Sequence, residues 1–191
     1  LVVDEPRGRR GSGGGGNGGN GAIDGGGAGE PAWSLTTSGQ RLARLYHECD
    51  LLVVEALEDG LFDGLEPAEV AALASAFTYE ERRSGPGGLT VRYPSDRLRR
   101  RFLRLQGLHL SLVADEADAR LAVTRAPDAG FMSIAHAWAA GGDLSDVLAD
   151  EQITAGDFVR TAKQLIDLLR QLGLLAPVPA TATAARQAAE A

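Results

Sequence analysis

Cysteine, lysine and long apolar runs are scarce or missing in this sequence of 191 residues. Cys49 is the single cysteine, which excludes a disulfide scaffold and a cysteine-rich zinc site. No apolar run reaches the roughly 18 residues that a membrane-spanning helix needs, and no charged-then-apolar signal segment occurs. The sequence therefore predicts no membrane partner, and we expect a cytoplasmic location.

The charge balance limits how the chain can meet nucleic acid. The formal net charge is −7 at pH 7, which argues against indiscriminate attraction to phosphate backbones. Nearly all the basic residues are arginine, and Lys163 is the single lysine. This usage, with abundant alanine and glycine, is typical of a high-GC bacterial genome. Any contact with nucleic acid is expected on one local face, against an acidic background.

The glycines divide the chain into two parts. Of its 25 glycines, 13 fall within the first 30 residues. Such a run loses much backbone entropy on ordering and has few apolar side chains to compensate for the loss. We predict a disordered glycine-rich linker or insert at 1–32 and one folded domain at 33–191. The chain also begins at Leu1 and ends in an uncapped alanine-rich stretch, which indicates a fragment of a longer protein.

Apolar residues recur at intervals of three and four along most of the folded part, which predicts helices. Ser38 and Ser95 are the expected N-caps, while Gly60 and Gly173 are expected to end helices. Only 33–37 and 89–93 have the character of a strand. The sequence thus predicts an all-α, multi-helix bundle. The predicted helices cover 38–58, 67–83, 96–118, 131–139 and 157–172, with a short helix at 143–149 and a last one after Pro179.

The predicted helix that ends at Leu172 has two distinct faces, and it begins at Thr154 or Asp157. The residues expected to point inward are Phe158, Val159, Ala162, Leu165, Ile166, Leu169 and Leu172. Arg160, Lys163 and Gln164 lie on the opposite face at i, i+3 and i+4, hence on one side of the helix.

Three segments carry a family resemblance. They read SGQRLARLYHECDLLVVEALEDGLFDGLEPAEVAALASAFTYEERR, GFMSIAHAWAAGGDLSDVL and ITAGDFVRTAKQLIDLLRQL. In this order they resemble the DSHCT domain, the C-terminal helical domain of superkiller-type DEVH-box ATP-dependent RNA helicases. The resemblance covers about residues 34–175 and marks 33–191 as a DSHCT-like domain. His47 departs from the family pattern, which has serine at that place.

The resemblance implies a place in a larger enzyme. Such helical modules close the ring around single-stranded RNA as it leaves the two motor domains of a 3′-to-5′ helicase. The sequence contains no GxxxxGK[ST] loop, so it offers no site for ATP chemistry. No cofactor is expected in this chain, while ATP and Mg²⁺ would belong to the motor domains. The implied partners are single-stranded RNA, the helicase's own motor domains and an RNA-degrading complex.

The resemblance also places an RNA-lining helix at 157–172. Arg160, Lys163 and Gln164 are its candidate RNA-binding residues, because arginine and lysine meet phosphates and glutamine can bond splayed bases. Glu55 matches an acidic position in the family's first helix. We expect it to bond a base or one of these basic groups.

The run RLRRRFLR is the densest basic segment, and Arg97, Arg100, Arg101 and Arg104 form a possible auxiliary basic patch. Either the patch binds nucleic acid or a motor domain, or it is a solvated face whose arginines pair with nearby carboxylates.

Two alternative functions remain compatible with the sequence. The bundle could be a scaffold that stabilises the motor without touching RNA, or a free-standing regulatory domain. No metal site is expected, because His47 and Cys49 are two apart on a predicted helix and no paired ligands follow. Cys49 lies on the apolar stripe and is expected in the core.

Overall fold

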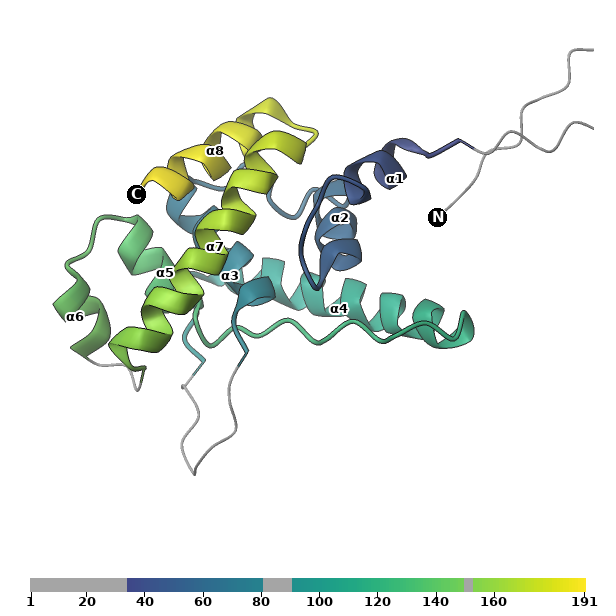
Figure 1. The fold of residues 1–191 in the computed structure, drawn as a ribbon. Helices are drawn as coiled ribbons and strands as arrows, with labels where there is room; N and C mark the ends of the chain where they lie inside the picture. The colour runs from purple at the N-terminus through teal and green to yellow at the C-terminus, as the bar shows by residue number, and fades with distance from the viewer. Residues whose placement is uncertain (1–33, 81–90, 150–152) are drawn as a thin grey trace, which may run out of the picture.

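The computed structural model describes residues 34–80, 91–149 and 153–191, and these ranges form eight helices and no strand (Figure 1). The all-α prediction is confirmed. The predicted linker at 1–32 lies outside the described residues. The helix predicted at 67–83 is shorter than expected, because it ends at Thr78 and Tyr79 has an extended backbone. No helix in the described ranges is long and apolar enough to span a membrane.

Helix α3 (Pro67–Thr78) lies at the centre of the bundle. Every residue from Val70 to Thr78 is buried, and the helix packs against α4, α5, α7 and α8. An alanine-rich helix suits this place, because small side chains let neighbours approach from all sides. Pro67 occupies the first turn, where its missing N–H costs no hydrogen bond.

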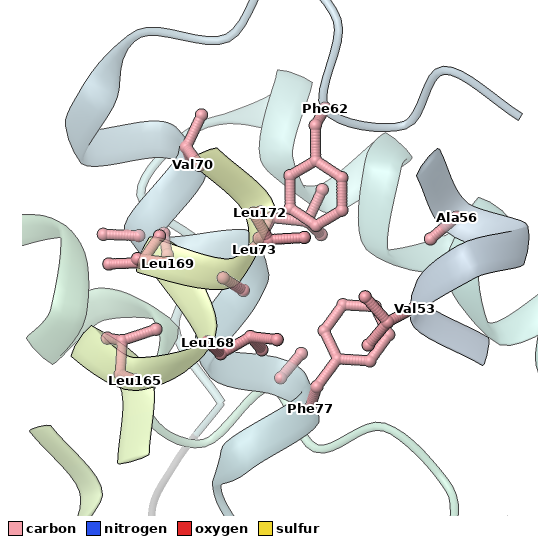
Figure 2. Close-up of a cluster of buried hydrophobic side chains, with 14 of the residues drawn as sticks. Val53, Ala56, Phe62, Val70, Leu73, Phe77, Leu165, Leu168, Leu169 and Leu172 are labelled. Atoms are coloured by element: carbon pink, nitrogen blue, oxygen red, sulfur yellow. The ribbon is translucent and has the colours of Figure 1, made fainter. Parts of the chain in front are cut away.

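Two C-terminal helices, α7 (Ala155–Leu175) and α8 (Pro179–Glu190), form an antiparallel pair that covers α3 (Figure 1). Figure 2 shows Leu168 and Leu172 of α7 in one cluster with Leu73 of α3, with the rings of Phe62 and Phe77 beside them. The two ring centroids are 6.3 Å apart in a stacked arrangement. Phe62 is buried, which shows that the turn after α2 folds back onto the core.

The other helices surround this centre. Helix α4 (Asp96–Asp118) is long, and Ser95 caps it as predicted, because its hydroxyl accepts a hydrogen bond from Leu98 N at 3.2 Å. Helices α5 (Met132–Ala139) and α6 (Leu144–Ala149) contact each other, and α5 packs on α3.

The helix predicted at 38–58 is interrupted, so that prediction is wrong in its extent. Helix α1 (Thr37–Leu42) is capped by Thr36 rather than Ser38, and seven residues separate it from α2 (Asp50–Glu58). The intervening residues, 43–49, form a turn, which we call the 43–49 turn. Within it, the backbone N–H and C=O of Tyr46 bond the side chain of Gln171 on a distant helix, so at Tyr46 a tertiary contact replaces the helical hydrogen bonds. Gly60 ends α2 with a φ of 67°, as predicted.

Gly173 does not end a helix, which corrects another prediction. Helix α7 continues through it to Leu175, and the glycine is buried where α8 crosses. A Cβ atom at Gly173 would lie 2.6 Å from Arg186 Cγ on α8. Glycine is therefore needed there for the close approach of two helices.

Two alanine substitutions are expected to change stability in opposite directions. Gly107→Ala in α4 should raise the free energy of unfolding by about 0.5–1 kcal/mol, since a Cβ there meets nothing within 4 Å and alanine favours helices. Gly173→Ala gains the same propensity but should lower the free energy of unfolding by about 1–2 kcal/mol net, because the Arg186 side chain must move away from its packed position on α8. Urea unfolding followed by circular dichroism measures both, and a stabilised Gly173→Ala would contradict the close approach.

Candidate nucleic-acid interface

The exposed face of α7 carries the residues predicted for RNA. Thr154 caps the helix, because its hydroxyl accepts a hydrogen bond from Asp157 N at 3.1 Å. Of the two predicted starts, the one at Thr154 is confirmed. Arg160, Lys163 and Gln164 are all exposed on this helix. With Asp167 and Gln171 they form one polar band, which we call the α7 face.

Charges on the α7 face are only partly neutralised. Arg160 pairs with Asp157 at 2.8 Å, and Arg170 approaches Asp167 at 3.7 Å. Lys163 makes no ion pair within the described residues. Exposed pairs within one helix are weak, so their arginines can exchange a carboxylate for a phosphate at little cost.

A surface hollow of about 310 Å³ adjoins the α7 face at its middle. The 43–49 turn forms one wall and α7 the other. The turn is fixed by Gln171, whose side-chain oxygen accepts from Tyr46 N at 2.7 Å and whose NH₂ donates to Tyr46 O at 3.4 Å. The lining residues are Tyr46, His47, Glu48, Thr78, Gln164, Asp167, Leu168 and Gln171.

Two titratable groups of the 43–49 turn are held in their neutral forms. Burial lowers the pKa of His47, so its imidazole is uncharged at pH 7, and its Nδ1 accepts a hydrogen bond from Cys49 N at 3.0 Å. Burial raises the pKa of Cys49 to about 11, so this thiol stays protonated and is no nucleophile at neutral pH. Cys49 is a core residue, as predicted.

Arg125 ties three segments together beside this hollow. Its guanidinium bonds Glu48 at 2.6 Å, donates to Tyr79 O at 3.0 Å and also donates to Phe77 O. It thereby satisfies carbonyls at the C-terminal end of α3 and anchors the 43–49 turn.

Glu55 lies apart from the α7 face. It is exposed on α2 and lines a second hollow of about 400 Å³ between α2 and α4, which shares no lining residue with the first. Within the described residues it makes no ion pair. The structure therefore does not bring Glu55 to Arg160, Lys163 or Gln164, and a role for Glu55 stays a prediction. The second hollow is lined by Leu51, Glu55, Leu108, Ser111, Leu112, Asp115, Glu116, Ala119 and Leu121.

Three of the four auxiliary arginines hold the turn between α2 and α3. Arg97 pairs with Glu69 at 3.0 Å, and Arg104 pairs with Asp59 at 2.6 Å. Arg101 donates to the carbonyls of Gly60 at 3.0 Å and Asp63 at 3.1 Å. These bonds fasten α4 to the centre of the bundle.

Arg100 is exposed and makes no ion pair in the part of the chain that the structure describes. It is the auxiliary arginine most available to a partner. No three His, Cys, Asp or Glu side chains among the described residues gather closely enough to hold a metal ion.

Sequence reasoning missed Tyr46, Gln171 and Arg125. The one signal for Tyr46 in the sequence was its place beside the predicted apolar stripe rather than on it. Nothing in the spacing indicated Gln171, because its bonds join residues 125 positions apart. Arg125 lies in a loop, where periodicity carries no information.

The fold and this face define a helical bundle with one side that presents exposed arginine, lysine and glutamine side chains. A model of the DSHCT (NUC185) domain matches residues 32–191, and the chain belongs to this family.

Three similar proteins are known by name. The chain is 44% identical over 163 residues to "Probable helicase HelY" of Mycobacterium leprae and 39% identical over 165 residues to the protein of that name in Mycobacterium tuberculosis. Each alignment covers 81% of this chain and 18% of the relative. "mRNA transport homolog 4" of Caenorhabditis elegans is 23% identical over 142 residues, which cover 73% of this chain and 14% of the relative. The chain thus spans less than a fifth of the length of these relatives.

Proposed function

We propose that this domain is the C-terminal helical module of an ATP-dependent 3′-to-5′ RNA helicase and that its α7 face guides single-stranded RNA. ATP and Mg²⁺ would bind in the motor domains, on which the bundle packs, and the enzyme would work in the cytoplasm, with an RNA-degrading complex as a further partner. The DSHCT family and the relatives named as probable helicases support a place in a helicase. The observation that carries the RNA contact is the exposed side of α7, where Arg160, Lys163 and Gln164 stand together.

The α7 face suits a single strand better than a duplex. Cations and an amide on one helix can follow a flexible backbone, whereas duplex recognition needs contacts spread over two grooves. An acidic chain with a local cationic face also explains how binding could be confined to one path.

Salt dependence of RNA binding tests this proposal. In the full-length gene product, the triple substitution Arg160→Ala, Lys163→Ala and Gln164→Ala should weaken binding of a short single-stranded RNA. The plot of log affinity against log salt should also become shallower by about 1.4, because two cations are removed and each phosphate contact of a single strand contributes about 0.7 to the slope. Fluorescence anisotropy over a series of salt concentrations measures both effects.

Matched variants distinguish an effect of the α7 face from an effect of losing positive charge anywhere on the surface. Gln164→Ala alone should leave the salt slope unchanged, since it removes no cation. Arg92→Ala with Arg99→Ala removes two exposed arginines outside α7 and should change the slope less than the α7 variant. Unaltered RNA binding and unwinding in the triple variant would contradict the proposal.

The rival function is a scaffold that touches no RNA. One observation favours it: the second hollow is mainly apolar, and Leu110, Leu121 and Val123 are exposed on α4 and the residues after it. Such a surface suits contact with another domain. An unaltered triple variant together with a Leu110→Asp variant that loses unwinding would favour the scaffold.

A further inference from the structure

Tyr46 is the most exposed large apolar side chain in the described residues, with 86% of its surface accessible. Tyrosine rings usually bury most of their surface, and this one contributes little to the core. Its neighbours in the turn behave differently, because Leu45 and Cys49 are both buried. The fold thus anchors the turn on both sides of Tyr46 and leaves its ring in solvent.

The backbone that carries this ring is fixed rather than loose. Gln171 bonds both the N–H and the C=O of Tyr46, in the manner of a paired strand. Arg125 holds the next part of the turn through Glu48. A ring presented from a fixed backbone loses little entropy when a ligand stacks on it, so it is preorganised for binding.

The hollow beside the ring suits a base and disfavours a phosphate. Its walls include the carboxylates of Glu48 and Asp167 and the amides of Gln164 and Gln171, while the His47 imidazole is uncharged. Carboxylates repel phosphate but accept hydrogen bonds from the amino groups of bases. A volume of about 310 Å³ is at the small end of ligand pockets, which fits one base rather than a longer segment.

Cations lie beside the hollow rather than inside it. Gln164 belongs to both the hollow and the α7 face, and Lys163 precedes it in the chain. Arg160 lies one helical turn before Gln164. A strand whose phosphates follow Arg160 and Lys163 therefore brings a base to the hollow.

We propose that the hollow beside Tyr46 receives one unpaired nucleobase that stacks on the Tyr46 ring. A base with an exocyclic amine fits best, because the amine donates to Asp167 while the Gln164 amide bonds the rest of its edge. This inference rests on the proposed function, since it adds a base site to the RNA path along α7.

Substitution of the ring tests the base site in the full-length gene product. Tyr46→Ala should weaken binding of single-stranded RNA about 5- to 150-fold, the range for one stacked base, whereas Tyr46→Phe should bind nearly as the wild type. The salt slope should stay unchanged in both, because no cation is removed. The unfolding midpoint should also stay unchanged, since the ring is outside the core.

An RNA of the same length that lacks its bases gives the second readout. Wild-type protein should bind it at least as weakly as Tyr46→Ala binds normal RNA, because the bonds of the base to Asp167 and Gln164 are lost as well. On the base-free RNA, Tyr46→Ala should bind nearly as the wild type does. A Tyr46→Ala variant with wild-type affinity would overturn the base site. If the salt slope still responded to Arg160 and Lys163, the proposed function would survive that result. Equal loss of affinity on normal and base-free RNA would also overturn the base site, and would point to a protein contact at Tyr46 instead.

Discussion

Replacing Leu168 with alanine is expected to lower the free energy of unfolding by about 3–4 kcal/mol, whereas Leu174→Ala should change it by about 0.5 kcal/mol or less. Both leucines lie on α7. Leu168 is 1% exposed and faces α3, while Leu174 is 74% exposed. The same atoms are removed in each variant from the same helix, so the difference reports burial alone.

The size of the Leu168 effect follows from where it packs. In Figure 2 its side chain lies among the leucines of α7 that point at α3, near the ring of Phe77. Truncation leaves a cavity between two helices that are held by other contacts, so the space cannot close fully. Urea unfolding of both variants measures the difference. Equal stabilities would mean that α7 turns a different side to the core.

Leu168 also shows how far residue spacing predicts the buried side of α7. Phe158, Ala162, Leu165, Leu169 and Leu172 are buried as predicted. Val159 was predicted inward and is 47% exposed, Ile166 is only half-buried, and Leu168 was not predicted to be buried. The stripe is displaced because α7 packs on both α3 and α8, and two neighbours at different angles widen and rotate the buried face. A single-helix pattern contains no information on the second neighbour.

The 43–49 turn is a second place where the sequence pattern does not predict the structure. Leucines and the cysteine before α2 keep helical spacing, and a continuous helix would satisfy their backbone locally. The structure instead bonds Tyr46 to Gln171, which lies 125 residues later. Bonds between segments so far apart leave no local signal, so tertiary contacts override propensity here.

The candidate site was predicted in part. Exposure of Arg160, Lys163 and Gln164 follows from the helical period, because they lie opposite the buried stripe. The hollow beside them could not be predicted from the helical period, since its other wall comes from the 43–49 turn. Arg97, Arg101 and Arg104 illustrate the same point, because their partners are carbonyls and carboxylates of α3 and of the turn before it.

Arg125→Ala is expected to lower the free energy of unfolding by about 2–4 kcal/mol, because it removes several charge-assisted hydrogen bonds at once. The guanidinium serves Phe77 O, Tyr79 O and the Glu48 carboxylate, and its side chain is largely buried. Without it, carbonyls at the end of α3 lose their partner in a place where water enters poorly.

Two further variants separate the charge from the geometry of Arg125. Arg125→Lys keeps the charge but cannot reach two carbonyls and a carboxylate together, so it should recover less than half of the loss. Glu48→Gln removes only the ion pair, and since Glu48 is 64% exposed the cost should stay below about 1 kcal/mol. Thermal and urea unfolding measure all three. If Glu48→Gln proved as costly as Arg125→Ala, the ion pair rather than the α3 carbonyls would be the main contribution, and Arg125 would act on the 43–49 turn alone.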